Sequence, residues 1–139
     1  MSSIPDASQE SLELREHART VSERAHAPYS GFRVGAALQF ADGTIVEGCN
    51  VENAAYGGTI CAERAALVRS IAEGRDLADV VRIAVHVDGP DGSPCGTCRQ
   101  SIVELAPQAT VAFVSGGRYV ELAAPDLLPA AFTPGALDA

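Results

Sequence analysis

The sequence contains no lysine and no tryptophan, and it is poor in aromatic residues. Only 5% of its residues are aromatic whereas 47% are hydrophobic, so the core must be built mainly from aliphatic side chains. All ten basic residues are arginine, a bias that either a GC-rich genome or adaptation of the surface to high salt would produce. A chain of 139 residues with this composition is expected to fold as one domain over 1–139, with its core at about 8–132.

The sequence also lacks a net positive charge and long apolar runs. The formal net charge is −8, so the surface as a whole repels polyanions and no nucleic-acid partner is expected. No apolar run approaches the roughly 20 residues that span a bilayer, and the N-terminus lacks the basic start and apolar stretch of a secretory signal. We therefore expect a soluble, cytoplasmic protein with no membrane partner.

Hydrophobic periodicity and turn signals predict the element order α-β-β-α-β-α-β-β. The predicted helices cover 8–26, 60–73 and 96–105, and the predicted strands cover 34–40, 44–49, 82–87, 110–114 and 119–122. The continuous apolar run over 82–87 is typical of a strand that is covered on both faces. This order predicts an α/β fold with three layers, α/β/α, in which helices cover both faces of one mixed five-stranded sheet.

Three of the four cysteines are spaced like metal ligands. Cys95 and Cys98 form a C-x-x-C motif at the predicted start of one helix, and Cys61 stands just ahead of another helical run. In a reducing compartment such cysteines favour a metal site or catalysis over disulfides. Three protein ligands leave a tetrahedral zinc ion with one open position, which is typical of a catalytic site. Cys49 is better explained as an ordinary buried thiol.

Two charged residues follow the first of these cysteines. Three thiolates around Zn²⁺ give a net charge of −1, which the positive ends of two helices and the Arg64 guanidinium could offset. A solvated surface charge is the other interpretation of Arg64. Glu63 is too close to Cys61 to be a fourth ligand without strain. By itself it would be an ordinary carboxylate at a helix N-terminus, but beside an open metal site a role as general acid and base is favoured.

Four segments carry a resemblance to a known family. They are YSGFRVGAA at 29–37, GCNVENAAY at 48–56, CAER at 61–64 and PCGTCRQ at 94–100. In this order they resemble cytidine deaminase of the small, homotetrameric, three-cysteine zinc type, and the similarity runs from about Arg19 to Phe132. The resemblance implies a cytidine deaminase-like fold and one zinc ion per subunit. It also implies hydrolytic deamination of cytidine and 2′-deoxycytidine to uridine and 2′-deoxyuridine, with release of ammonia, in pyrimidine salvage.

The resemblance also implies roles for individual residues. Cys61, Cys95 and Cys98 would bind zinc, with Arg64 behind them. Glu63 would take a proton from the attacking water and protonate pyrimidine N3, and it would then transfer a proton to the leaving amine.

Further positions match contacts with the substrate. Asn50 and Glu52 match a pair that binds the ribose. Phe32 matches a residue that packs against the pyrimidine, and Ala62 is also expected to contact the substrate. Tyr56 and Phe132 match aromatic residues that act across a subunit interface in a tetramer with shared active sites. Core packing is the other interpretation of these two aromatic residues.

Three rival functions remain. Blasticidin-type nucleoside antibiotic deaminases share the zinc motifs, although the pair formed by Asn50 and Glu52 favours a free ribose. A deaminase that acts on polynucleotides is disfavoured by the acidic composition. A purely structural zinc module would need a fourth protein ligand, for which Cys49 is the only spare sulfur.

Overall fold

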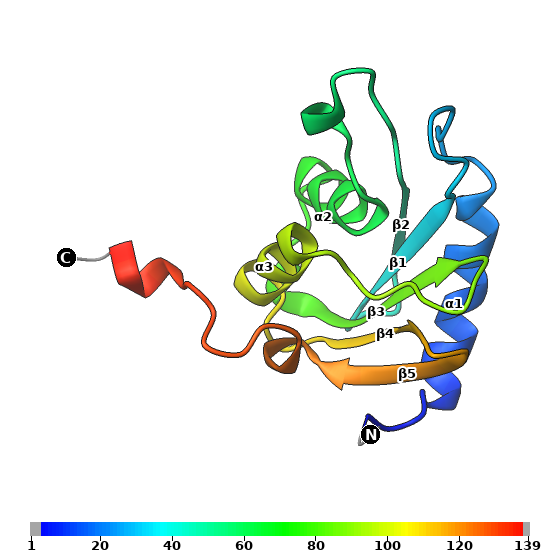
Figure 1. The fold of residues 1–139 in the computed structure, drawn as a ribbon. Helices are drawn as coiled ribbons and strands as arrows, with labels where there is room; N and C mark the ends of the chain where they lie inside the picture. Colours follow the sequence, from blue (N-terminus) through cyan, green and yellow to red (C-terminus); the bar gives the residue numbers. More distant parts are fainter. Residues whose placement is uncertain (1–3, 138–139) are drawn as a thin grey trace.

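The computed structural model describes residues 4–137, so residues 1–3 and 138–139 of the predicted domain lie outside the described residues. The predicted element order is confirmed (Figure 1). The helices are α1 (Gln9–Ser22), α2 (Ala62–Ala72) and α3 (Gly96–Leu105), and the strands are β1 (Val34–Phe40), β2 (Ile45–Cys49), β3 (Val80–Val87), β4 (Thr110–Ser115) and β5 (Arg118–Ala123). Short 3₁₀ turns are η1 (Tyr56–Gly58), η2 (Leu77–Asp79), η3 (Ala124–Leu127) and η4 (Pro134–Leu137).

The five strands form one sheet in the order β2-β1-β3-β4-β5. The pair β3 and β4 is parallel, whereas the other three pairs are antiparallel, so the sheet is mixed as predicted. Helix α1 covers one face of the sheet, and α2 and α3 cover the other (Figure 1). The predicted three-layer α/β/α fold is therefore confirmed.

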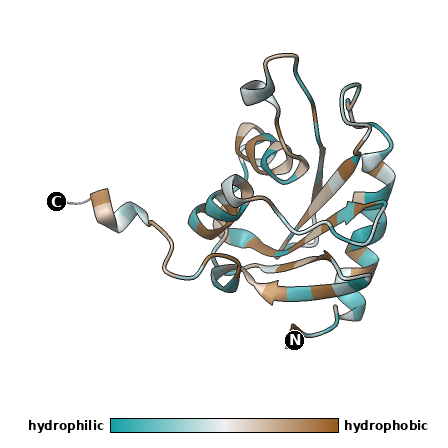
Figure 2. Ribbon diagram, viewed as in Figure 1, coloured by the Kyte–Doolittle hydropathy of each residue, from teal (hydrophilic) through white to brown (hydrophobic). Residues whose placement is uncertain are grey.

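Alternating side chains of the strands supply a separate hydrophobic cluster on each face. Ala36 and Leu38 of β1 point into the larger cluster, which includes side chains of α2 and α3. Ala37, between them, joins a smaller cluster with Leu14 and Ala18 of α1. This period-2 pattern is what a strand with two covered faces requires. In Figure 2, hydrophobic residues accordingly recur along the strands, while α1 is largely hydrophilic.

Two glycines allow the helices to approach the sheet closely. A Cβ atom at Gly35 would lie 1.8 Å from the Ala18 carbonyl oxygen of α1. A Cβ atom at Gly48 would lie 2.5 Å from the Ala66 backbone nitrogen of α2. Only a residue without a side chain fits at either position, so the glycines set the distances between the layers.

The segments that carry the predicted metal ligands leave the sheet at the same edge. The antiparallel register pairs Val34 at the start of β1 with Val87 at the end of β3, and pairs Gly35 with Cys49 at the end of β2. The connections from β2 to α2 and from β3 to α3 therefore leave the sheet at the same edge. Beyond η3 the chain runs away from the sheet toward η4 (Figure 1).

None of the helices within residues 4–137 has both the length and the apolar character needed to cross a membrane.

Candidate active site

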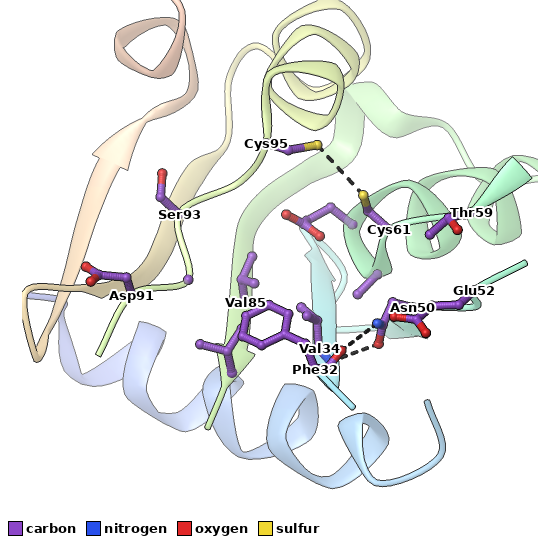
Figure 3. Close-up of a pocket in the computed structure, with 14 residues that line it drawn as sticks. Phe32, Val34, Asn50, Glu52, Thr59, Cys61, Val85, Asp91, Ser93 and Cys95 are labelled. Carbon is purple, nitrogen blue, oxygen red and sulfur yellow. Dashed lines mark hydrogen bonds between the residues drawn. The ribbon is translucent and has the colours of Figure 1, made fainter. Parts of the chain in front are cut away.

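The three predicted metal ligands lie together at this edge of the sheet. The sulfur atoms of Cys61, Cys95 and Cys98 are all within 4.8 Å of one another, and the Sγ atoms of Cys61 and Cys95 are 3.7 Å apart (Figure 3). Two sulfurs that ligate one tetrahedral zinc at about 2.3 Å lie about 3.8 Å apart, so this spacing fits a shared zinc ion. Within residues 4–137 the cluster includes no fourth cysteine, histidine or carboxylate.

All three cysteines lie at the N-terminal ends of helices, which position their sulfur atoms. Cys61 and Cys95 are the N-cap residues of α2 and α3, and both have extended backbone angles and no side-chain capping bond. Cys98 lies in the first turn of α3 and is fully buried. Both helices therefore direct their positive ends and free N–H groups toward the thiolates, which stabilises negative charge there.

The pKa directions of the three free thiols can be compared with what a bound cation requires. Burial is the main cause that raises the pKa of Cys61 and of Cys98 above the ordinary value of a thiol. Burial would also raise the pKa of Cys95, but hydrogen bonds from Cys98 and Cys61 outweigh it and the pKa is lowered. A bound divalent cation reverses the effect of burial, because it holds its cysteine ligands as thiolates. The donor set therefore fits zinc.

Arg64 lies against this cluster. Its Nη2 atom donates to the Cys61 sulfur at 3.7 Å and to the Thr59 carbonyl oxygen at 3.3 Å. The bond to Cys61 is the largest cause that raises the pKa of the guanidinium, which stays charged. Its Nε atom is buried with no hydrogen-bond partner in the part of the chain that the structure describes. A positive group in this place offsets part of the charge of three thiolates.

Glu63 follows Cys61 by two residues and is almost completely buried, with 4% of its surface exposed. It also lines a cavity beside Cys61 and Cys95. Burial raises the pKa of this carboxyl above its ordinary value, and a hydrogen bond from its own backbone N–H and the charge of Arg64 oppose that effect only in part. A carboxyl group with a raised pKa in a cavity is suited to accept and return a proton.

A cavity of about 440 Å³ opens over Glu63. This volume suits a small organic molecule. Its lining is the set Phe32, Val34, Asn50, Glu52, Thr59, Cys61, Ala62, Glu63, Val85, Val87, Asp91, Gly92, Ser93 and Cys95 (Figure 3). The structure thus places Phe32, Asn50, Glu52 and Ala62, four predicted substrate contacts, around the cavity that contains two of the cysteines and Glu63.

Asn50 holds the backbone of two residues that line this cavity. Its Nδ2 atom donates to the Phe32 carbonyl oxygen at 2.8 Å, and its Oδ1 atom accepts from the Val34 N–H at 2.9 Å (Figure 3). Asn50 is buried, whereas Phe32 is 49% exposed and lines the same cavity. One Nδ2 hydrogen and one Oδ1 lone pair remain for a ligand.

Glu52 is also engaged within the chain. Its Oε1 atom accepts from the backbone N–H groups of Tyr29 and Ser30 at 2.9 and 3.1 Å, and its Oε2 atom accepts from the Ser30 hydroxyl. The hydroxyl of Ser30 is the largest cause that lowers the pKa of Glu52, which therefore stays ionised. A carboxylate oxygen accepts more than one hydrogen bond, so a sugar hydroxyl can join these donors.

The two predicted intersubunit aromatic residues lie outside this cavity. Tyr56 is 77% exposed and forms an edge-to-face contact with Tyr29, with the ring centroids 6.3 Å apart. Phe132 is 61% exposed on the segment that leaves the sheet, where Gln100 Nε2 donates to its carbonyl oxygen at 2.9 Å. The alternative interpretation, that these two side chains pack in the core of their own chain, is therefore wrong.

Sequence reasoning missed several cavity-lining residues. They are Val34 at the start of β1, Val85 and Val87 near the end of β3, and residues 91–93, which line the cavity just before the C-x-x-C motif. The 91–93 segment could have been found from its position next to Pro94. The valines carry no signal that distinguishes them from core residues.

The comparisons with known proteins agree with this geometry. The family model described as "Cytidine and deoxycytidylate deaminase zinc-binding region" matches residues 8–114. A cytidine deaminase from Halalkalibacterium halodurans is 46% identical over 123 residues, which cover 86% of this chain and 92% of that protein. The crystal structure of cytidine deaminase from Burkholderia pseudomallei matches with a TM-score of 0.81 and 44% identity, covering 91% of this chain and all of that one.

A related antibiotic deaminase is more distant. The blasticidin-S deaminase of Bacillus cereus is 32% identical over 137 residues, which cover 91% of this chain and 94% of that protein.

Proposed function

Since the chain belongs to the cytidine and deoxycytidylate deaminase family, we propose that it hydrolyses cytidine and 2′-deoxycytidine to uridine and 2′-deoxyuridine, with release of ammonia. It is an enzyme, and its activity is that of a cytidine deaminase. The observation that carries this function is the buried carboxyl group of Glu63, which shares one cavity with Cys61 and Cys95. A structural zinc module does not require that arrangement, and the net charge of −8 disfavours a polynucleotide substrate.

The enzyme binds one zinc ion per subunit, and Cys61, Cys95 and Cys98 are the residues that would hold it. When bound, zinc supplies Lewis-acid activation of a water molecule. Arg64 and the N-termini of α2 and α3 stabilise the ligand thiolates, because each presents positive charge to them. A structural zinc module would need a fourth protein ligand, and the described residues provide none in the cluster.

Glu63 performs the proton transfers in this proposal. Its carboxylate accepts a proton from the attacking water and delivers it to N3 of the pyrimidine, which makes C4 electrophilic. The hydroxide that remains adds to C4. The Glu63 carboxylate then takes the proton of the new C4 hydroxyl group and gives it to the exocyclic amine, so that the C4=O bond of the product forms as the C4–N bond breaks and ammonia leaves. Burial supports this role, because it raises the pKa of Glu63 and keeps solvent from exchanging the proton.

Residues of the cavity wall orient the nucleoside. Phe32 packs on the pyrimidine, Ala62 leaves room beside the ligand, and Asn50 and Glu52 take up the ribose hydroxyls. The free hydrogen-bonding capacity of Asn50 and Glu52 supports this role, since each has at least one acceptor position that the chain itself does not use. Both also hold the backbone near Phe32, so sugar binding and base stacking are coupled.

The assembly that we propose is a homotetramer with shared active sites. The exposure of Tyr56 and Phe132 supports this proposal, because large aromatic side chains at exposed positions are typical of interfaces. The segment that carries Phe132 leaves its own sheet and can reach a neighbouring subunit (Figure 1). Each subunit consists of the single domain whose core spans about 8–132. We also propose that the enzyme acts in the cytoplasm, in pyrimidine salvage.

A spectrophotometric comparison of substrates tests the proposal. The loss of ultraviolet absorbance on deamination is followed with cytidine, 2′-deoxycytidine and blasticidin S on the same zinc-loaded preparation. The 32% identity to a blasticidin-S deaminase makes the antibiotic the natural competitor. We expect turnover of both nucleosides. Turnover of blasticidin S with no reaction of either nucleoside would overturn the proposed substrate.

A further inference from the structure

Cys95 is the metal-site cysteine with the least packing around its side chain. Cys98 is fully buried and Cys61 is partly buried, whereas Cys95 is exposed. Few side chains therefore hold the Cys95 sulfur in place. Its position depends on the backbone that carries it, and above all on the peptide group that joins Pro94 to Cys95.

Arg99 holds that peptide group. Its Nε atom donates to the Pro94 carbonyl oxygen at 2.8 Å, and its Nη2 atom donates to the hydroxyl of Ser93. One turn back along α3, the backbone N–H of Arg99 donates to the Cys95 carbonyl oxygen at 2.9 Å. The guanidinium and the helix thus fix the chain on both sides of the Cys95 Cα atom.

The third bond of the guanidinium leads to the core. Arg99 Nη1 donates to the Leu127 carbonyl oxygen at 2.8 Å. Leu127 belongs to the larger hydrophobic cluster and is only 1% exposed, so its carbonyl oxygen is a fixed acceptor. A planar guanidinium can hold three acceptors in one rigid arrangement, which an ammonium group on a flexible stem cannot do.

We propose that Arg99 is a positioning residue for the metal site, which ties the backbone of Cys95 to the core through Leu127. This inference rests on the proposed three-cysteine zinc site. It gives Arg99 a role that differs from that of Arg64, which donates to a ligand sulfur. It also gives η3 a role, because η3 carries the core-anchored acceptor to which the metal loop is tied.

The rate at which the holoenzyme releases zinc to a chromogenic chelator tests this role at 25 °C. Loss of groups that orient metal ligands typically weakens metal affinity by roughly 10- to 100-fold, so we expect Arg99→Gln to release zinc about tenfold faster than wild type. Arg99→Lys should be intermediate, because an ammonium group can reach one of the carbonyl oxygens but not all acceptors. Ser93→Ala, which removes one acceptor, should have a smaller effect.

Two control variants separate positioning from general loss of stability. Gln100→Ala changes the next residue of α3, which binds the Phe132 carbonyl oxygen and not the metal loop. Arg69→Gln removes an arginine of α2 that also donates to a backbone carbonyl oxygen, that of Glu47 at 3.0 Å, away from the cysteines. Both controls should release zinc within twofold of the wild-type rate, whatever their melting temperatures.

A spectroscopic measurement complements the rate. In the cobalt-substituted protein, Arg99→Gln should shift the thiolate-to-cobalt absorption bands, and the controls should leave them unchanged. Release of zinc from Arg99→Gln at the wild-type rate would overturn the inference, as would equal acceleration in Arg69→Gln. Failure of the wild-type protein itself to hold one equivalent of zinc would overturn the proposed metal site together with this inference.

Discussion

Replacing Gly48 by alanine tests whether the contact between β2 and α2 sets the positions of Cys61 and Glu63. The added methyl group would lie 2.5 Å from the Ala66 nitrogen, 2.7 Å from the Ala62 carbonyl oxygen and 2.9 Å from the Ala66 Cα atom. All three atoms are backbone, so no side chain can rotate away. Ordinary contacts begin near 3.4 Å, and α2 must therefore move by roughly 1 Å.

Two consequences follow from this displacement. Overpacking of this kind typically costs about 1–3 kcal/mol. For a domain of this size the melting temperature should therefore fall by roughly 4–10 °C. Cys61 and Glu63 move with the start of α2, and a misplacement of about 1 Å in a catalytic group can lower the rate by about 100-fold.

Differential scanning fluorimetry and steady-state kinetics on cytidine measure both effects. Gly89→Ala is the matched control, because a Cβ atom at Gly89 has no neighbour within 4 Å. That control should behave as wild type in both assays. If Gly48→Ala kept the wild-type melting temperature and kcat/KM within a factor of two, the argument that this glycine sets the position of α2 would be refuted.

Three further predictions concern other parts of the molecule. Burial alone would raise the pKa of Glu121, but hydrogen bonds, chiefly from Ser8 and Ser11, lower it. Its carboxylate therefore stabilises the fold at pH values above the ordinary pKa of about 4.3, and that contribution is lost as the pH falls through the lowered pKa. Glu121→Gln should lower the melting temperature at pH 7 and flatten its decline below about pH 4. Asn50→Ala removes the acceptor of the Val34 N–H and the donor to the Phe32 carbonyl oxygen. Urea titration should therefore show that the free energy of unfolding falls by about 1–3 kcal/mol, and kinetics should show a raised KM for cytidine. Phe132→Ala should lower activity, and mixing it with Glu63→Gln subunits should restore part of that activity if Phe132 acts in a neighbouring site.

The metal ligands were predictable because their signal is local. A cysteine just before an apolar helical run becomes the N-cap of that helix, as Cys61 and Cys95 show. The predicted helix over 60–73 began two residues too early because Cys61 is the cap and not part of the helix. The element order followed from hydrophobic periodicity and turn signals. The strand order did not, since pairing between β1 and β3 joins segments that are far apart in the sequence.

The packing that holds the site was not predictable in the same way. Gly48 is one of 13 glycines, and no pattern around it reveals that α2 lies against it. The bonds from Asn50 to Phe32 and Val34 and from Arg99 to Leu127 also depend on tertiary structure. A motif can indicate that a polar residue matters, but only the fold shows whether it contacts a ligand, the backbone or both.

We propose that Glu63 transfers protons beside a zinc site that other residues hold. Metal analysis and cytidine turnover, measured on the same preparations of wild type and Glu63→Gln, test this role. We expect one zinc per subunit in both proteins and a kcat at least about 100-fold lower in the variant. Undiminished turnover in Glu63→Gln, or loss of zinc in parallel with loss of activity, would contradict it.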